Sequence, residues 1–385
     1  MLMPLAVRRV ESAQDFRAFF EFPWHLYKND PYWVPPLLSM RRDLLDKTKN
    51  PEWEYLEGDY FAAWRGDQIV GTIAAFINHR HNECNHDHIG WFGAFEVRDD
   101  QEAAVALLTT AADWVQARGY DAIVGPQTFT THGDCGILVD GFMRPTLLMP
   151  YNYPYYSSMV ECAGFQKRED LYSFHLSRDQ AIQKGLLERL QRVTKSVMKR
   201  NQITIRPIDR SHLSDEFRLF KELYNVTFDD TGGFFPLTPA ELDALVDSLG
   251  RFFDPDFAFF AYLKGEPVGF VMGIPDFNQV LKKAAARPGV PEFITLLRGL
   301  WYWKINPVMD WIRIALLGVK QQCRGKGVDV ALCGTLLAAI LNSPQFEHSD
   351  AGWTSELNTK SASLTRNMGF EVYKTHRLYE KRLKA

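Results

Sequence analysis

Long apolar runs and strong net charge are both missing from this sequence. The most apolar stretch, residues 293–319, is interrupted by Arg298, Lys304, Asp310 and Arg313, each of which is costly at the centre of a bilayer. The N-terminal residues also lack the apolar core and cleavage site of a signal peptide. The formal net charge of −3 gives no general positive field, so any contact with nucleic acid or an anionic membrane would be local. These absences predict a soluble, cytoplasmic protein with no transmembrane segment and no stable nucleic-acid partner.

Cysteine is scarce as well, and its arrangement argues against disulfides and zinc. The five cysteines are odd in number and lack C-x-x-C spacing, which suits reduced thiols: Cys84, Cys135, Cys162, Cys323 and Cys333. The segment from His79 to His88 gathers four histidines around Glu83 and Cys84. Its spacing matches no closed zinc motif, so a polar hairpin tip is favoured over a metal site, and no metal is predicted.

The length of 385 residues and the 46% hydrophobic content predict two folded domains. Two hairpin patterns, 60–73 and 257–272, each join aromatic-rich runs through a tight polar turn, and both enter the second strand with a Val-Gly step. A Gly-Phe pair recurs at Gly164 and Gly369, at a similar offset of about 200 residues. A period this long indicates a domain duplication, because solenoid repeats are shorter than about 50 residues.

Strands alternate with helices in each copy, which predicts an α/β fold with one mixed sheet per lobe. The first lobe is expected over 1–176 and the second over 203–385, with a helical insertion at 275–310 in the second. A connecting helix is expected over 177–202, and one face of it is basic: Arg189, Arg192, Lys195, Lys199 and Arg200. That face could contact tRNA, although a solvated helix face is favoured.

Residues 312–340 predict a strand, a glycine loop and a helix. Gly325 and Gly327 let the backbone of the loop turn tightly and approach a ligand closely, while free N–H groups at the helix start point towards an anion. A pyrophosphate fits such a site. The P-loop spacing and the three-glycine dinucleotide fingerprint are both absent, which leaves coenzyme A as the remaining common ligand.

In the order and spacing of these features, residues 203–385 resemble the GNAT acyltransferase superfamily. The family's pyrophosphate loop maps onto residues 322–327, after a strand whose last residue, Val319, matches a strand that diverges from its neighbour beside the pantetheine. A second signature, an Asn placed before a small residue and a Gly-Phe pair, maps onto Asn358, Ser361 and Gly369. The resemblance and the loop amides together give these residues as the acyl-CoA site: Val319, Gln322, Cys323, Arg324, Gly325, Lys326, Gly327, Val328, Asn358 and Ser361.

The resemblance implies direct attack of an amine on the thioester in a ternary complex, with backbone groups of the diverging strands stabilising the oxyanion. The family's Tyr acid is replaced here by Thr365, a poor proton donor, and Tyr373 or Tyr379 could substitute for it. Glu356 is the candidate general base because it lies at the carboxyl end of a predicted strand, where the active sites of the family open, although an ordinary exposed glutamate at a strand end is slightly favoured. Asp310 is a weaker candidate.

The first lobe departs from the family at both signatures. Acidic residues of the segment 96–102 occupy the loop position and would repel a pyrophosphate, and Tyr153 stands in place of the Asn. Two other segments are candidate sites. The loop 130–135 mixes a hydroxyl, an imidazole, a carboxylate and a thiol but equally suggests a turn, and the aromatic run 151–156 is expected to pack in the core or between the lobes.

The sequence therefore predicts two GNAT-like lobes in tandem, of which the second binds acetyl-CoA or another acyl-CoA and the first shapes the site of the acceptor. The predicted activity is acyl transfer to an amine. A two-lobe transferase that uses aminoacyl-tRNA and a non-catalytic acyl-CoA sensor are the alternatives, and a homodimer is one possible assembly. The insertion carries an apolar stretch at 292–304, for which core or interlobe packing is favoured over a roof for a long acyl chain.

Overall fold

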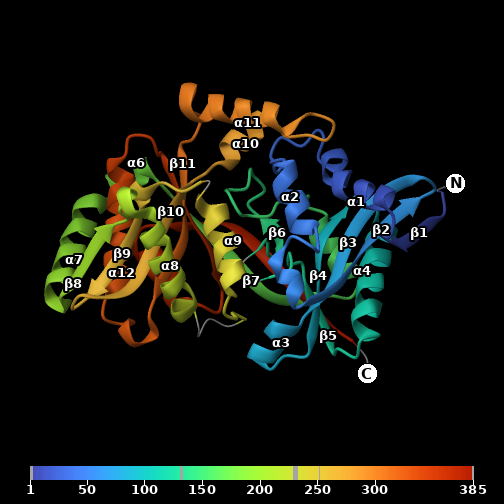
Figure 1. Cartoon of the computed structure of the whole chain (residues 1–385), viewed down its shortest axis with the longest axis horizontal. Coiled ribbons are helices and arrows are strands. Elements are labelled where there is room, and N and C mark those ends of the chain that lie inside the picture. Colours follow the sequence, from blue (N-terminus) through green and yellow to red (C-terminus); the bar gives the residue numbers. More distant parts are fainter. Residues whose placement is uncertain (1–2, 131–132, 229–232, 251, 384–385) are drawn as a thin grey trace. The chain divides into compact units, whose positions relative to one another are not determined.

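A computed structural model describes residues 3–130, 133–228, 233–250 and 252–383 of the chain (Figure 1). The chain forms two compact units. The first comprises Met1–Leu171, Val280–Asn306 and Lys374–Ala385, and the second comprises Tyr172–Gln279 and Pro307–Tyr373. Strands β7 (Gln166–Ser177) and β13 (Glu371–Arg382) and helix α10 (Asn278–Ala284) are therefore divided between the units. Residues 280–306 of the insertion group with the first unit rather than with the lobe that surrounds them in sequence.

The sheet of the first unit has the order β1-β2-β3-β4-β5-β13, followed by the first half of β7, and β6 pairs with β13. The pairs β1–β2, β2–β3, β3–β4, β5–β13 and β6–β13 are antiparallel, and β4 and β5 run parallel. The strands are β1 (Leu5–Arg9), β2 (Leu56–Arg65), β3 (Gln68–Asn78), β4 (Ile89–Val97), β5 (Ala122–Gly125) and β6 (Ile137–Asp140), and the helices are α1 (Ala13–Leu26), α2 (Leu38–Leu45), α3 (His79–Asn85), α4 (Gln101–Gln116), α5 (Tyr156–Cys162) and α11 (Glu292–Leu300).

Helix α4 supplies much of the first unit's core. Its apolar residues recur at helical spacing, so one face is buried against β3 and β4, with Leu107, Leu108 and Val115 fully enclosed. Asp100 begins the helix as its N-cap, and its carboxylate accepts a hydrogen bond from the Ala103 N–H at 3.1 Å. A second core contains Phe19, Phe20 and Trp24 of α1 together with Tyr60 of β2.

The sheet of the second unit starts with the second half of β7 and continues β12-β11-β10-β9-β8. Strands β11 and β12 run parallel. Lys264 and Gly265 both have positive φ, which closes β9 and β10 into a tight hairpin. The strands are β8 (Ile203–Pro207), β9 (Ala258–Leu263), β10 (Glu266–Pro275), β11 (Trp311–Val319) and β12 (His348–Ser355), and the helices are α6 (Arg178–Gln183), α7 (Leu186–Asn201), α8 (Leu213–Phe228), α9 (Pro239–Gly250), α12 (Val328–Asn342) and α13 (Thr359–Asn367).

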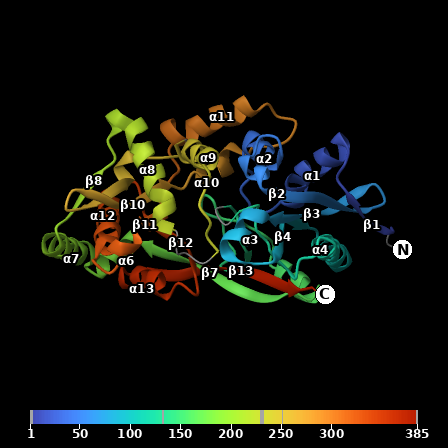
Figure 2. The same cartoon turned by 60° about the horizontal axis from the view of Figure 1, so that its bottom comes forward.

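The connecting segment forms two helices, because Gly185 takes a left-handed conformation between α6 and α7. Helix α7 lies along α12 (Figure 2). The approach is close: a Cβ added to Gly334 would come within 2.1 Å of the Thr194 hydroxyl oxygen. The basic face predicted for this helix is exposed.

The predicted mixed α/β fold in two lobes is confirmed, and the strand, loop and helix expected over 312–340 are β11, the loop 320–327 and α12. In the part of the chain that the structure describes, no helix is both long enough and apolar enough to cross a membrane.

Candidate active site

Strands β11 and β12 pair for only four residues and then separate. Their parallel ladder runs from Trp311 opposite His348 to Ile314 opposite Ala351, whereas β11 continues to Val319 and β12 to Ser355. On its other side β11 stays paired with β10 as far as Val319. The edge of β11 that faces β12 thus leaves the ladder at Ile314, and its backbone groups can pair with an extended ligand. The divergence implied by the GNAT resemblance is present, with its apex at Ile314 and Ala351 and its open end at Val319.

The loop at the open end is shaped by two glycines. Gly325 and Gly327 have φ of +72° and +81°, a left-handed region of backbone conformation that residues other than glycine adopt at a cost. A Cβ on Gly325 would meet nothing within 4 Å, so this part of the loop faces open space. A Cβ on Gly327 would lie 2.6 Å from Val197 Cγ1, so this glycine also lets α7 approach the loop.

Helix α12 begins at Val328 with Gly327 as its N-cap and no side-chain cap among the described residues. The first backbone N–H groups of a helix have no partner inside the helix and carry a partial positive charge. Here they follow a loop that has open space at Gly325. This arrangement can bind an anion such as a pyrophosphate.

The predicted loop residues divide into three kinds. Cys323 and Val328 are buried in the core, so only their backbone can reach a ligand. The side chains of Gln322 and Lys326 are exposed and can extend towards one. Arg324 instead donates hydrogen bonds to the carbonyl oxygens of Val319 at 3.2 Å and Thr227 at 2.7 Å, so its guanidinium holds the loop against β11 and α8.

Asn201, which the sequence did not single out, also fixes the loop. Its side-chain Nδ2 donates to the Lys326 carbonyl at 2.8 Å from the last turn of α7. The connecting helix therefore supports the glycine loop directly. No local motif marks this contact, because it joins residues 125 positions apart.

The second predicted signature forms the start of a helix. Asn358 is the N-cap of α13, and its Oδ1 accepts a hydrogen bond from the Ser361 N–H at 3.1 Å. Thr365, one turn further on, donates its hydroxyl proton to the Ser361 carbonyl at 3.0 Å. This internal bond makes the Thr365 hydroxyl a poor proton donor to a leaving group.

The remaining candidates for proton transfer differ in position. Glu356 is half-buried in the turn that directly follows β12, on the side where the strands diverge. Asp310 precedes β11, at the opposite end of the parallel pair, and its carboxylate accepts from the Gln279 amide at 2.5 Å. Tyr373 donates to the buried Asp350 at 2.6 Å, and Tyr379 donates to Glu161 in the first unit at 3.0 Å. Glu356 is the one of these on the open side of the strand pair.

A cluster of aromatic and imidazole groups lies near the paired end of β11 and β12. His175 stacks on Trp311 with ring centroids 4.9 Å apart, and its Nε2 lies 3.1 Å from Nδ1 of His348. Burial, together with the neighbouring His348, lowers the pKa of His175 to about 4, so its imidazole is neutral at pH 7. Sequence reasoning missed this cluster because it depends on the register that sets Trp311 beside His348.

In the first unit, the equivalent strand end and helix start hydrogen-bond to side chains of the protein itself. Val97 aligns with Val319, since each pairs with the glycine of the repeated Val-Gly step. The Val97 N–H donates to the Tyr156 hydroxyl at 2.9 Å, and the Tyr155 hydroxyl donates to the Val97 carbonyl at 2.9 Å. The helix that follows is capped by Asp100, which also binds Arg65 at 2.6 Å.

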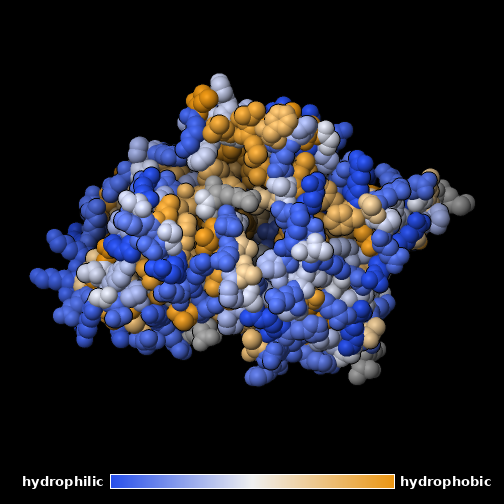
Figure 3. Space-filling model, viewed as in Figure 1, coloured by the Kyte–Doolittle hydropathy of each residue, from blue (hydrophilic) through white to orange (hydrophobic). Residues whose placement is uncertain are grey.

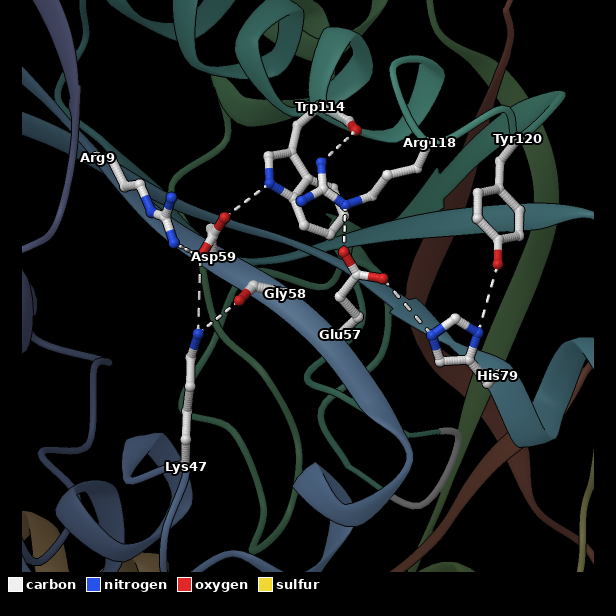
Figure 4. Close-up of polar contacts among 9 residues, drawn as sticks. All are labelled: Arg9, Lys47, Glu57, Gly58, Asp59, His79, Trp114, Arg118 and Tyr120. Atoms are coloured by element: carbon white, nitrogen blue, oxygen red, sulfur yellow. Dashed lines mark hydrogen bonds and ion pairs between the residues drawn. The ribbon is translucent and has the colours of Figure 1, made fainter.

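The histidine-rich segment connects the antiparallel strands β3 and β4, as expected for a hairpin tip, and its first part forms the short helix α3. Its histidines have separate partners. His81 Nε2 contacts Asp87 at 3.1 Å and His88 Nδ1 contacts Asp121 at 2.9 Å. His79 lies between Tyr120 and Glu57, at the edge of a polar network centred on Asp59 of β2 (Figure 4). Within the described residues, no group of three or more His, Cys, Asp or Glu side chains is arranged to hold a metal ion.

The other two candidate segments lie in the first unit. In the loop 130–135, residues 131 and 132 lie outside the described residues, while Cys135 is buried and its burial raises the pKa of the thiol. The aromatic run 151–156 packs against the core as expected, with the rings of Tyr153 and Tyr155 stacked 5.4 Å apart.

Solved structures with a similar fold align with this chain over nearly its whole length. One is a tandem GNAT protein from the clavulanic acid biosynthesis pathway, 11% identical, with a TM-score of 0.52 over 99% of both chains. Another is a GCN5-related N-acetyltransferase from Sphaerobacter thermophilus, 13% identical, with a TM-score of 0.52 over 100% of this chain and 98% of that one. The chain has the tandem GNAT fold. This confirms the fold expected from the glycine loop and the diverging strands.

Two curated proteins are similar to this tandem GNAT chain over nearly its whole length. "Protein YghO" of Escherichia coli is 29% identical over 98% of this chain and 95% of its own length. "Bacterial ceramide synthase" of Caulobacter vibrioides is 29% identical over 98% of both chains. No family model matches the sequence.

Proposed function

We propose that the protein is an acyl-CoA-dependent N-acyltransferase whose second unit binds the acyl-CoA. The observation that carries the proposal is the divergence of β11 and β12 into an open loop and an uncapped helix start. The pyrophosphate of CoA would bind the amides of 324–328, and the pantetheine would extend along the free edge of β11 towards Ile314. A cytoplasmic location, where acyl-CoA is supplied, is part of this proposal.

In the proposed reaction, the amine nitrogen of the acceptor attacks the thioester carbonyl and a C–N bond forms. Backbone N–H groups on the free edge of β11 stabilise the oxyanion of the tetrahedral intermediate, which collapses by breaking the C–S bond. The amine proton passes to Glu356 or to a water, and the CoA thiolate leaves. A thiol with a pKa of about 8.5 is a fair leaving group in water, so the reaction needs no strong acid at Thr365.

The acceptor is proposed from the chemistry of one relative. A ceramide is a long-chain amino alcohol acylated on nitrogen, so the name of the Caulobacter relative makes a sphingoid base the first acceptor to test and a long-chain acyl-CoA the first donor. Release of CoA thiol from a panel of acyl-CoA chain lengths, with and without a sphingoid base, would identify the pair.

Gly325→Glu tests the proposed loop. The open space around Gly325 accommodates the side chain, and its carboxylate would face the pyrophosphate, so binding of CoA by isothermal titration calorimetry should be lost. Gly265→Glu is the matched control, since Gly265 also has a positive φ, of +89°, and open space around it, but lies in the hairpin between β9 and β10. Undiminished CoA affinity in Gly325→Glu would contradict the loop assignment.

A non-catalytic acyl-CoA sensor is the second candidate, because the Thr365 hydroxyl is bonded within its own helix. A sensor would bind acyl-CoA without releasing thiol for any amine in the panel. The tRNA-dependent alternative predicts that ribonuclease treatment abolishes activity, and the exposed basic face of α7 is the surface it would use.

A further inference from the structure

Helix α11 and the π-helical turn that follows it, Trp301–Ile305, expose a stripe of large apolar side chains. The exposed fractions, from 37% to 64%, are those of Phe293, Leu296, Leu297, Leu300, Trp301, Trp303 and Ile305. Positions 293, 296, 297 and 300 follow helical spacing, so they share one face. Figure 3 shows hydrophobic residues gathered at the top of the view, where Figure 1 places α11. This stretch does not pack in the core, contrary to the expectation from sequence.

The opposite face of the segment is fixed to the first unit. Thr295 is 3% exposed, and the Glu292 carboxylate accepts hydrogen bonds from the Ser39 N–H at 2.7 Å and the Ser39 hydroxyl at 2.6 Å. Upstream, the Trp24 indole N–H donates to the Ala286 carbonyl at 2.7 Å, and Lys282 donates to the Trp33 carbonyl at 2.6 Å. The apolar stripe is therefore the outer face of an anchored element.

The charge of this segment differs from that of the rest of the chain. Residues 280–306 contain five basic residues and one acidic residue, a formal charge of +4, within a chain of net charge −3. The acidic residue is Glu292, which already binds Ser39. Arg298 and Lys304 are exposed beside the apolar stripe, and the Lys304 ammonium lies 3.8 Å from the centre of the Trp303 ring. The segment thus combines a net positive charge with an apolar helix face that ends in tryptophans, which is the chemistry of an interfacial membrane helix.

We propose that the outer face of α11 and its π-helical turn docks on the surface of an anionic lipid bilayer. The apolar side chains would enter the headgroup–acyl boundary, the tryptophans would lie at the level of the headgroups, and Arg298 and Lys304 would meet lipid phosphates. A second copy of the chain fits this face less well. A symmetric dimer built on it would oppose Arg298 and Lys304 with their own copies, and no exposed acidic residue of the segment could pair with them.

Vesicle flotation tests the proposal with the full chain. The wild type should float with vesicles of phosphatidylethanolamine and phosphatidylglycerol and bind less to phosphatidylcholine alone. Leu297→Glu combined with Trp301→Glu should lower the bound fraction about tenfold or more, since two apolar anchors become anions at an anionic surface. Arg298→Glu combined with Lys304→Glu should weaken binding to the anionic vesicles and reduce its sensitivity to salt.

The control variant is Val193→Glu combined with Val226→Glu, which alters two exposed valines, 43% and 48% exposed, in the second unit. It should float like the wild type, and circular dichroism should show all variants folded. A wild type that does not float, or that floats equally well after the α11 changes, would overturn the proposal. The proposal would also be overturned if the wild type does not bind vesicles but forms a dimer in analytical ultracentrifugation, and the α11 changes disrupt that dimer. Thiol release with soluble substrates is independent of these outcomes.

Discussion

Both units contain a strand, a loop and a helix in succession, but a side chain caps the start of the helix in the first unit, whereas none of the described residues does so in the second. In the first unit, Asp100 caps α4 with its own carboxylate and binds Arg65. In the second unit, Gly327 precedes α12 and brings no side chain. A helix start attracts anions, so a built-in carboxylate occupies the site that a phosphate would need. The comparison shows that the first unit satisfies with its own side chains the backbone groups that, in the second unit, are proposed to bind a phosphate.

The strand ends differ in the same sense. Hydroxyls of Tyr155 and Tyr156 hydrogen-bond both backbone groups of Val97, whereas at Val319 the carbonyl is bound by Arg324 from the loop itself. The chain after β5 also lies close against β4, since a Cβ on Gly93 would be only 2.0 Å from the Gln127 carbonyl oxygen. This part of the edge of β4 is therefore covered by the protein and is closed to a ligand. Native mass spectrometry should therefore find one CoA per chain.

Among the changes that exchange features between the two units, the largest effect is expected from giving the second unit the acidic loop of the first. Gln322→Glu combined with Lys326→Glu places two carboxylates on exposed side chains beside the proposed pyrophosphate site without changing a glycine. Loss of the lysine and addition of two negative charges should weaken CoA binding on the order of 100-fold. Calorimetry measures the change, and Lys264→Glu, in the turn between β9 and β10 and outside the loop, should leave the affinity unaltered. An equal loss in that control would mean that net charge, and not the loop, decides binding.

The converse change removes the cap of the first unit. Asp100→Ala deletes both the hydrogen bond to Ala103 and the ion pair with Arg65, so unfolding of the first unit should become easier by about 2 kcal/mol. Urea denaturation followed by circular dichroism measures this, and Ser12→Ala, an exposed cap of α1, should cost less. The stoichiometry of CoA should stay at one, because the tyrosines still close the strand end. A second bound CoA would show that the cap alone excludes it.

Local sequence patterns predicted much of this architecture. The hairpins expected over 60–73 and 257–272 correspond to β2–β3 and β9–β10, and the strand and helix expected within 312–340 are β11 and α12. The N-cap role of Asp100 also has a local signal, since an Asp directly before a helix with periodic apolar residues is a common N-cap. These features depend on spacing within a few residues, which a single sequence displays.

Features that depend on distant contacts were not predicted. The hydroxyl bonds that close the first unit join Tyr156 to Val97, and the cluster at His175 requires the register of β11 and β12. The anchoring of the insertion on the first unit rests on Ser39 and Glu292, which are 253 positions apart. Such pairs are set by how the sheets assemble, and no periodicity in one segment reveals them.

The two units should respond to pH in opposite directions. Burial raises the pKa of Glu96 in the first unit to about 7 from 4.5, against the opposing hydrogen bonds from Tyr27 and Tyr156. The folded state thus holds this proton more tightly, so its stabilising effect is complete below pH 4.5 and is lost as the pH rises to 7. The pKa of His175 in the second unit falls to about 4 from 6.5, so stability is complete above pH 6.5 and is lost as the pH falls to 4.

Two substitutions separate these effects. Glu96→Gln should flatten the loss of thermal stability between pH 4.5 and 7, and His175→Gln should flatten the loss between pH 6.5 and 4. Thermal melts over this range, followed by circular dichroism, measure both. Parallel pH profiles of the two variants and the wild type would show that other groups set the dependence.

The smallest effect is expected at Thr365, the position that the family's acid would occupy. In the repeat, Gly164 matches Gly369, so the first unit has the fully buried Val160 at this place. Thr365→Val therefore gives the second unit the residue of the first and removes the hydroxyl, which donates to the Ser361 carbonyl at 3.0 Å. Thiol release in a saturating acyl-CoA assay should change less than about threefold, because the thiolate leaves without a strong acid. A fall in kcat of about tenfold or more at constant KM, restored by Thr365→Ser, would instead identify this hydroxyl as the proton donor.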